Sequence, residues 1–313
     1  MNKLITLLTV SFFLLGNHSF IQTEKGTKIQ IQKNGSKGEL LIFIHGGPGM
    51  PGYMDTLANQ FLTTNTTVTY YQRDKTNSPS VGPFTVQKHV DDLLYIIEYY
   101  SKSYKSISII AHSWGTNLVL SSLARRKLRN IKQIVLLSPA PVKFNFFKDF
   151  YASIYKKASK NRKSTIRKYI ETWKNPDFKS TRIEYQYHQQ WFKEILPYYF
   201  YSKSQENKRK ILSEIQSDYK NWEGSKEAVK SFYSNSTLRE QIYKKNKTLK
   251  NLYLLYGTED PFYSRDNMNW FKETFNSINI FSFTDTGHCP WLEDSNSNFL
   301  KKLKKLVKGK LND

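Results

Sequence analysis

Ser113 lies in a pentad, Ala111 to Gly115, whose residue types and spacing suit nucleophilic catalysis. The pentad follows an apolar, β-branched run, Ile107 to Ile110, and an amphipathic helical pattern from Asn117 to Arg126 comes directly after it. A serine at so tight a turn stands above the carboxyl end of a parallel sheet, where the helix N-terminus faces the developing negative charge. The alternative is a serine that caps an ordinary helix. The strand–turn–helix context favours a nucleophile at Ser113.

A serine hydroxyl is a poor nucleophile until a base takes its proton, and that base needs an acid to orient it. His288 follows the apolar run Asn279 to Phe283, and Asp260 follows the run Leu252 to Tyr256. Both side chains are therefore expected at the carboxyl ends of strands. The predicted triad is Ser113, Asp260 and His288.

Other assignments of the acid and the base are open. Glu259 or Asp285 could supply the carboxylate, and Asp260, which precedes Pro261, could be a turn or helix-capping residue. His288 could be an ordinary loop histidine, but the chain has six histidines and this one lies where a base is required. Asp285 is three residues before His288, which is more typical of a turn. Asp260 is the preferred acid.

An oxyanion hole needs two backbone N–H donors that are in place before charge develops on the substrate oxygen. The first predicted donor is Trp114, the residue after the nucleophile. The second should come from the glycine-rich loop His45 to Gly49, because glycines let the backbone turn inward and approach the substrate. Gly47 is the predicted donor, with Gly46 as its alternative, and a simple tight loop is the other interpretation.

Strand and helix signals alternate along the chain both before residue 142 and after residue 247. This predicts an α/β fold with a mostly parallel sheet and helices on both faces. The strand signals fall at Thr27 to Gln32, Glu39 to Ile44, Thr67 to Gln72, Ile107 to Ile110, Lys132 to Leu137, Leu252 to Tyr256 and Asn279 to Phe283. Helical patterns fall at Val86 to Tyr100 and Leu292 to Val307.

Between residues 142 and 247 the strand signals vanish. Aromatic-rich helical stretches take their place at Tyr151 to Tyr169, Tyr185 to Tyr201 and Lys208 to Asp218. The segment carries 24 lysines and arginines against 11 aspartates and glutamates, a net charge of +13. Such an insertion between two strands is typical of a helical cap over an active site. The predicted core is therefore 21–141 with 248–313, and the predicted cap is 142–247.

The first twenty residues are typical of an export signal. Lys3 precedes an uncharged run, Leu4 to Leu15, which has the length of a signal-peptide core and is too short to span a bilayer. No Ala-x-Ala cleavage pattern follows, so an uncleaved anchor that touches the membrane is the alternative. The single cysteine, Cys289, allows no disulfide within the chain. We expect an exported protein, periplasmic, secreted or anchored.

The chain is strongly basic, with 48 lysines and arginines against 26 aspartates and glutamates and a net charge of +22. Such a charge could attract nucleic acid or an anionic membrane. The basic residues are spread over every segment and form no arginine-rich or recognised nucleic-acid motif, so no nucleic-acid partner is expected. The sequence also lacks a metal-ligand cluster, a phosphate loop and a dinucleotide fingerprint. No cofactor is expected.

His45 to Gly49 reads His-Gly-Gly-Pro-Gly, Tyr71 to Asp74 reads Tyr-Gln-Arg-Asp, and Ala111 to Gly115 is the pentad around Ser113. These stretches resemble the HGGPG signature, the D-Q-R-G stretch and the G-x-S-W-G elbow of the prolyl iminopeptidase family of α/β-hydrolase serine peptidases. Gly257 to Asp260 and Gly287 to Glu293 are similar to the segments that hold its acid and base. The resemblance implies an α/β-hydrolase fold, the chain order serine, acid, histidine, and release of the N-terminal residue of a short peptide.

Tyr219 to Gly224 resembles the family's W-x-x-W-E-G motif, whose glutamate holds the substrate's α-amino group. The resemblance implies this role for Glu223, and a carboxylate among aromatic side chains suits an ammonium ion within so basic a cap. The alternative is a surface helix residue. The chain departs from the family at Tyr71, Asp74 and Ala111, and it has no R-I-E-N-H-Y-F motif after Glu223.

The sequence thus predicts an exported serine hydrolase that cleaves a small molecule or short peptide through an acyl-serine intermediate. The preferred activity is an aminopeptidase of the prolyl iminopeptidase type. One alternative is an esterase, lactonase or amide hydrolase with the same triad and no recognition of an amino group. Another is a basic surface-binding protein that keeps the fold without turnover.

Overall fold

The structure of the chain is a computed structural model. It describes residues 18–23, 26–48, 50, 52–73, 78–80, 82–174, 194–201, 222–246, 249–293 and 298–310.

The described strands form an eight-stranded sheet in the order β1-β2-β4-β3-β5-β6-β7-β8. β2 pairs antiparallel with both β1 and β4, whereas the other neighbours are parallel. The mostly parallel sheet that the sequence predicted is confirmed. The strands are β1 (His18–Gln22), β2 (Lys28–Asn34), β3 (Leu40–Ile44), β4 (Thr66–Tyr70), β5 (Ile107–His112), β6 (Ile131–Leu137), β7 (Leu252–Gly257) and β8 (Ile278–Phe283).

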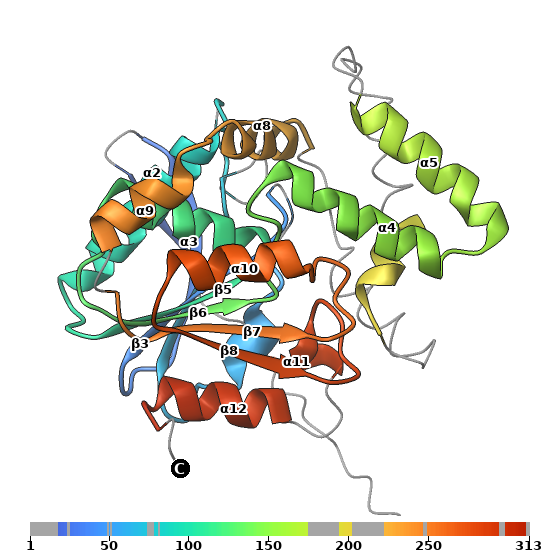
Figure 1. Ribbon diagram of the computed structural model, residues 1–313. Helices are drawn as coiled ribbons and strands as arrows, with labels where there is room; N and C mark the ends of the chain where they lie inside the picture. Colours follow the sequence, from blue (N-terminus) through green and yellow to red (C-terminus); the bar gives the residue numbers. More distant parts are fainter. Residues whose placement is uncertain are drawn as a thin grey trace, which may run out of the picture.

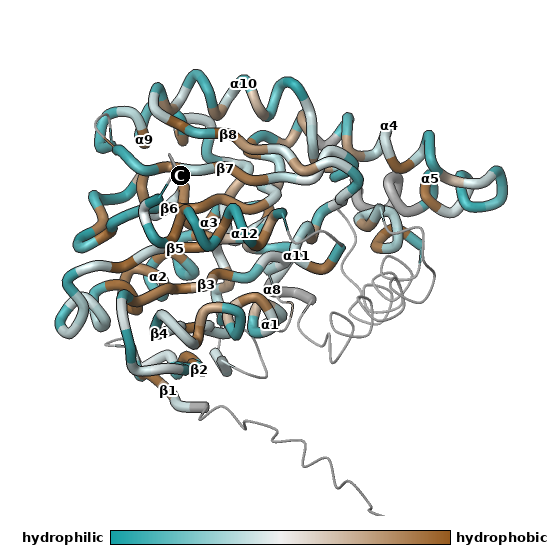
Figure 2. The backbone as a smooth tube through the Cα atoms, turned by 90° about the horizontal axis from the view of Figure 1, so that it is seen from below, coloured by the Kyte–Doolittle hydropathy of each residue, from teal (hydrophilic) through white to brown (hydrophobic). Residues whose placement is uncertain are grey.

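Both faces of the central strands are buried. Successive side chains of a strand point to opposite faces, so each strand contributes side chains to the cores on both sides of the sheet. In β3, Leu40 and Ile42 belong to one hydrophobic cluster, and Leu41 and Phe43 belong to another. The central strands are brown with hydrophobic residues in Figure 2, whereas the outer turns of α10 are largely teal. Continuous apolar runs are therefore what this sheet requires.

Helices cover both faces, as predicted (Figure 1). The first cluster includes side chains from α2 (Val86–Ser101), α3 (Trp114–Arg125), α9 (Leu238–Asn246) and α10 (Arg265–Thr274). The second includes side chains from α1 (Asp55–Asn59) and α12 (Asn298–Val307). The predicted helix from Leu292 onward is divided, because α11 (Pro290–Glu293) is a separate short helix before α12.

The segment between β6 and β7 supplies a third hydrophobic cluster. It begins with η1 (Phe144–Phe146), α4 (Phe147–Lys157) and α5 (Lys160–Lys174), and it continues in η2 (Leu196–Tyr199). α4 and α5 lie beyond the carboxyl ends of β7 and β8, on the side of α11 (Figure 1). Phe150, Ile154, Ile166 and Leu196 pack in this cluster against Phe262, which comes from the core.

The predicted cap helices differ from the described ones. The stretch Tyr151 to Tyr169 is divided between α4 and α5, because the backbone is extended at Ala158, with ψ at 143°. Of the stretch Tyr185 to Tyr201, residues 194–201 are described and contain the η2 turn, whereas Lys208 to Asp218 lies outside the described residues.

The last part of the predicted cap, 142–247, packs with the helices of the core. Ala228 and Phe232 of α8 (Trp222–Tyr233) and Leu238 and Ile242 of α9 belong to the same cluster as α2 and α3. Asn246 Nδ2 donates to the carbonyl of Leu123 at 2.5 Å, which fixes the end of α9 to α3. The apolar faces of α8 and α9 are therefore buried in the same cluster as the helices that cover the sheet.

The predicted leader, 1–20, overlaps the first strand. His18, Ser19 and Phe20 pair with Gln32, Ile31 and Gln30 in the antiparallel ladder of β1 and β2. Residues 1–17 lie outside the described part of the chain. None of the helices that the structure describes has the length and apolar character needed to cross a bilayer.

Candidate active site

Ser113 is held in a strained turn between β5 and α3. Its backbone angles are φ 53° and ψ −121°, a region that costs a residue other than glycine about 1 to 3 kcal/mol. The Ser113 N–H donates to the Leu137 carbonyl at 3.0 Å, and its own carbonyl accepts from Thr116 Oγ1 at 2.6 Å. A Cβ on Gly115 would lie 2.5 Å from the carbonyl oxygen of Ile44, so only glycine fits there. The predicted strand–turn–helix context is present around Ser113.

Asp260 and His288, which come from the loops after β7 and β8, are in direct contact. His288 Nδ1 lies 2.9 Å from Asp260 Oδ2, and the other oxygen, Oδ1, accepts from the N–H of Phe262 at 2.9 Å. Both residues are buried, with exposed fractions of 4% for His288 and 5% for Asp260. A carboxylate in contact with Nδ1 favours a proton there, which leaves the lone pair of a neutral imidazole on Nε2. Nε2 is the nitrogen that a general base would use.

The two other candidate acids lie elsewhere. Glu259 Oε2 pairs with Lys157 at 3.2 Å on the surface, where both side chains are more than a third exposed. Asp285 is exposed and has a φ of 55°, which is typical of a turn. The structure therefore brings Asp260, rather than Glu259 or Asp285, to His288.

His112 links the loop of His288 to the strand that ends at Ser113. The rings of His112 and His288 have their centroids 4.6 Å apart, and His112 Nε2 lies 2.8 Å from the carbonyl oxygen of His288. Burial, with nearby His288, lowers the pKa of His112 well below its usual range. A neutral histidine beside Ser113 thus holds the backbone of the predicted base.

The glycine-rich loop lies against the serine. A Cβ on Gly46 would be 2.6 Å from the Ser113 Cβ, so this close approach requires glycine. The Gly46 N–H donates to Tyr53 Oη at 2.9 Å, and the Gly46 carbonyl lies 2.8 Å from His45 Nδ1. Because its N–H is engaged by Tyr53, Gly46 is a poorer candidate than Gly47 for a donor to the substrate. Trp114, the other candidate, is the first residue of α3.

Segment 194–201, which lies within the predicted cap, packs against the imidazole of His288. The ring of Tyr199 lies 5.0 Å from that imidazole and the ring of Phe262 lies 4.8 Å from it, both nearly edge to face. The His288 N–H donates to the Tyr199 carbonyl at 2.7 Å. Aromatic side chains around a histidine shield it from water, so the imidazole of His288 lies in a largely apolar setting.

Glu223 lies in the first turn of α8, but its side chain is outside the described residues, so its predicted contact with an amino group stays a prediction. One turn further on, Glu227 Oε2 accepts from the N–H of Phe84 at 2.7 Å. Glu227 therefore joins α8 to the residues that precede α2.

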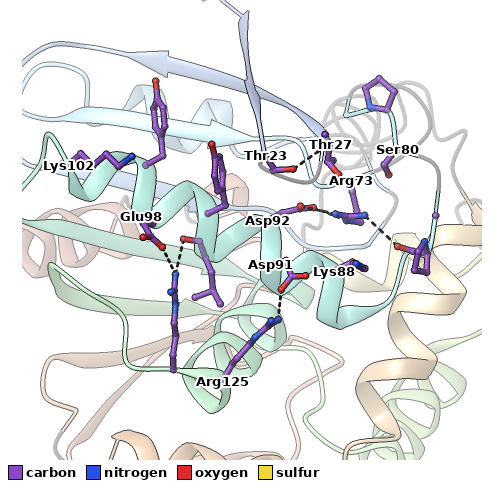
Figure 3. Close-up of a pocket in the computed structure, with 18 residues that line it drawn as sticks. Thr23, Thr27, Arg73, Ser80, Lys88, Asp91, Asp92, Glu98, Lys102 and Arg125 are labelled. Atoms are coloured by element: carbon purple, nitrogen blue, oxygen red, sulfur yellow. Dashed lines mark hydrogen bonds and ion pairs between the residues drawn. The ribbon is translucent and has the colours of Figure 1, made fainter.

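Arg73, from the stretch similar to D-Q-R-G, lines a groove along α2 (Figure 3). Its Nε and Nη2 contact the two oxygens of Asp92 at 2.7 Å each, and Nη1 lies 3.5 Å from the Pro83 carbonyl. Burial raises the pKa of Asp92, while the ion pair with Arg73 opposes that shift. This buried pair anchors the end of β4, beside Gln72.

Gln72, the neighbour of Arg73, supports the glycine-rich loop. Its backbone N–H donates to His45 Nε2 at 3.2 Å, and its side-chain amide donates to the His45 carbonyl at 2.6 Å. Because Nε2 of His45 accepts, Nδ1 carries the proton and donates to Gly46. Gln72, His45 and His112 lie within the motifs found in the sequence, but none of the three was predicted to have a role, and no sequence signal pointed to Tyr53.

Across the part of the chain that the structure describes, no three His, Cys, Asp or Glu residues are arranged to hold a metal ion.

A family model described as the alpha/beta hydrolase fold matches residues 39–295 of the chain. A comparison with curated protein sequences finds no significant match.

Solved structures resemble the chain at low identity. An esterase from Exiguobacterium antarcticum has a TM-score of 0.70 and 15% identity, covering 93% of this chain and 99% of the esterase. A proline iminopeptidase from Mycobacterium smegmatis has a TM-score of 0.67 and 14% identity, covering 94% and 99% of the two chains. Est816, described as an N-acyl homoserine lactone degrading enzyme, has a TM-score of 0.62 and 15% identity, covering 91% and 99%. At such identities the likeness establishes the fold alone.

Proposed function

The chain belongs to the alpha/beta hydrolase fold family, and on that premise we propose that it is a serine hydrolase with Ser113 as nucleophile, His288 as base and Asp260 as the orienting acid. The contact of 2.9 Å between His288 Nδ1 and Asp260 Oδ2 is the observation that carries the proposal. The strained backbone of Ser113 at the end of β5 supports it, because strain at a non-glycine residue gathers at functional sites.

In the proposed reaction, Ser113 Oγ attacks the substrate carbonyl carbon while His288 Nε2 takes the hydroxyl proton. The tetrahedral intermediate collapses to an acyl-serine when His288 returns that proton to the leaving amine or alcohol. Water then attacks the acyl-serine while His288 Nε2 takes a proton from it. When the second tetrahedral intermediate collapses, His288 returns that proton to Ser113 Oγ, and the carboxylic acid is released. The backbone N–H groups of Gly47 and Trp114 stabilise the oxyanion in both steps.

For the substrate, we propose the N-terminal residue of a short peptide, released by an aminopeptidase of the prolyl iminopeptidase type. The loop His45 to Gly49 and the position of Glu223 on α8 support this choice. A structural neighbour with this activity, the proline iminopeptidase, has the same fold.

An esterase or lactonase is the second candidate function. Neighbours described as an esterase and as a lactone-degrading enzyme have comparable TM-scores. The aromatic rings of Tyr199 and Phe262 beside His288 would suit an apolar acyl or alcohol group equally well.

The two candidates are separated by assaying the purified protein on aminoacyl-arylamides, including a proline arylamide, beside short-chain aryl esters. An aminopeptidase hydrolyses arylamides with a free amino group but not the same arylamides once that group is acetylated. An esterase hydrolyses the esters, and acetylation of the amino group does not change its rate on the arylamides. If neither set is hydrolysed and a fluorophosphonate does not label Ser113, the serine-hydrolase proposal is wrong.

We further propose that residues 1–20 direct export, because an uncharged run of signal-peptide length, Leu4 to Leu15, follows Lys3. Fractionation of the producing cells, with mass spectrometry of the protein's N-terminus, tests this. Recovery of the intact chain in the cytosol would contradict it.

A further inference from the structure

We propose that Tyr53 and His112 are positioning residues that join the glycine-rich loop to the loop of His288 through one directed chain of hydrogen bonds. The proposal rests on the serine-hydrolase function and adds to it two residues that fix the oxyanion loop relative to the base. Neither residue belongs to the predicted triad or to the predicted pair of oxyanion donors.

The chain of hydrogen bonds runs through four residues. The Gly46 N–H is 2.9 Å from Tyr53 Oη, and Tyr53 Oη is 2.6 Å from His112 Nδ1. His112 Nε2 is 2.8 Å from the carbonyl oxygen of His288. All three distances lie within the normal range for hydrogen bonds. Residues from the loop after β3, from β5 and from the loop after β8 are therefore connected without a gap.

The direction of each hydrogen bond follows from the groups at its two ends. The backbone N–H of Gly46 can only donate, and the carbonyl of His288 can only accept, so Nε2 of His112 carries a proton. His112 is neutral, because burial lowers its pKa well below the usual range, and its Nδ1 is therefore an acceptor. The Tyr53 hydroxyl must then donate to Nδ1 while it accepts from Gly46.

This arrangement uses the proton of Tyr53 and the proton of neutral His112 once each. A second proton on His112 would leave Nδ1–H facing an oxygen that already accepts from Gly46, so the phenolic proton would lose its acceptor. Burial raises the pKa of Tyr53 well above its usual range, which keeps the phenol protonated. The chain of hydrogen bonds therefore has one stable direction in this buried setting.

Packing holds the same groups in place. The His112 ring lies edge to face with Tyr53, at 5.6 Å between centroids, and with Trp291, at 4.7 Å. His112 immediately precedes Ser113, and Gly46 lies directly against the Ser113 side chain. A shift of the glycine-rich loop or of the loop of His288 would therefore change the geometry around Ser113. Errors of about 1 Å at a reacting centre can cost roughly 100-fold in rate.

The first test is Tyr53→Phe, which keeps the ring and removes the hydroxyl. We expect kcat to fall roughly 10- to 100-fold with KM changed less than about threefold, because the oxyanion donors matter most in the transition state. Tyr95→Phe is the matched control. Its hydroxyl donates to the Gln22 carbonyl at 3.0 Å on an exposed part of α2, so its loss should leave kcat unchanged.

The second variant is His112→Gln, whose amide can still donate toward the His288 carbonyl but offers no acceptor in the place of Nδ1. We expect a similar loss of kcat, and we expect the double variant to lose no more than the worse single variant, because both changes break the same chain. If circular dichroism shows that Tyr53→Phe or His112→Gln does not fold, the other variant supplies the kinetic comparison.

A third measurement does not depend on turnover. In the Ser113→Ala protein, nitrogen NMR of the His112 imidazole should show Nε2 protonated and Nδ1 unprotonated at neutral pH. A protonated Nδ1, wild-type kcat in folded Tyr53→Phe, or additive losses in the double variant would each overturn the positioning proposal while leaving the hydrolase proposal standing. Failure of the wild-type protein to hydrolyse any ester or amide, or to react with a fluorophosphonate, would overturn the proposed function instead.

Discussion

Glu293 accepts a hydrogen bond from the backbone N–H of Tyr201 at 2.6 Å, which joins segment 194–201 to the segment that follows the predicted base. The other carboxylate oxygen of Glu293 accepts from the N–H of Gly287 at 3.1 Å. One side chain therefore holds the cap segment 194–201 against the loop of His288, and the His288 N–H donates to Tyr199 in the same contact.

Replacing Glu293 should therefore loosen segment 194–201 where it packs against the loop of His288. We expect Glu293→Ala to destabilise the protein by about 1 to 3 kcal/mol, because two backbone N–H groups lose their acceptor. Urea unfolding measures this loss, and hydrogen exchange should rise at Tyr201 and Gly287. Glu259→Ala removes only the surface pair with Lys157 and is the control, expected to change stability by less than about 1 kcal/mol. Equal effects of the two substitutions would contradict the role of Glu293.

Ser113→Ala should abolish hydrolysis of every substrate and leave the fold intact. Loss of the nucleophile of a triad lowers kcat by roughly four to six orders of magnitude. Activity is measured on the best ester or arylamide, with circular dichroism and thermal unfolding to verify folding. Turnover at the wild-type rate by the folded variant would show that another residue is the nucleophile.

Asp260→Asn should retain the structure and lose most of the rate, because an amide in place of the carboxylate no longer holds His288 in the required tautomer. We expect a loss of about 10⁴ in kcat. Asp285→Asn is the matched control, because Asp285 is exposed in a turn, and it should change kcat little. The reverse order of the two effects would mean that Asp285 is the acid.

If Glu223 binds the substrate's ammonium group, Glu223→Gln should lower kcat/KM for free-amino substrates by roughly 10- to 100-fold, since a charge-assisted contact contributes about 1.5 to 3 kcal/mol. N-acetylated substrates should be poor for the wild type and should lose little more. Glu227→Gln is the control on the same helix, because its amide oxygen can still accept from Phe84. Equal turnover of blocked and unblocked substrates by the wild type would end the aminopeptidase proposal.

His89 should make the fold sensitive to acid. Burial lowers the pKa of His89 to about 3, and nearby Arg73 and His45 add to that shift. Because the folded pKa lies below the unfolded value near 6.5, the stabilisation is present above about pH 6.5 and is lost progressively as pH falls toward 3. Between pH 7 and pH 4.5 this group should account for a loss of about 2 to 3 kcal/mol in the free energy of unfolding. The His89→Gln protein, unfolded in urea at both pH values, should lose less stability than the wild type, and an equal loss would contradict the assignment.

The sequence by itself determined the class of the fold. Apolar runs such as Glu39 to Ile44 and Leu252 to Tyr256 are β3 and β7 to within a residue, because burial on both faces requires a continuous apolar strand. The context of Ser113 could also be predicted from the sequence, because the strand, the tight turn and the helix around it are formed by consecutive residues.

The sequence preferred Asp260 as the partner of His288 but left Glu259 and Asp285 open as alternatives. Glu259, Asp260 and Asp285 are all acids in loops that follow strands, and local sequence does not distinguish their directions. The fold buries Asp260 against Nδ1 of His288 and leaves Glu259 on the surface. The helix α9 likewise belongs to the core layer because of where its apolar face packs, which a helical pattern alone does not decide.

Only the tertiary structure decided which polar groups hold the site together. Tyr53 is 59 positions from His112, and His112 is 176 positions from His288, so no periodicity or motif joins them. Their hydrogen bonds exist because the order β3, β5, β6, β7, β8 brings the carboxyl ends of these strands to one edge of the sheet. Local sequence specifies strands, helices and turns through nearest neighbours, whereas the partners of a buried histidine depend on strand order and packing across the whole chain.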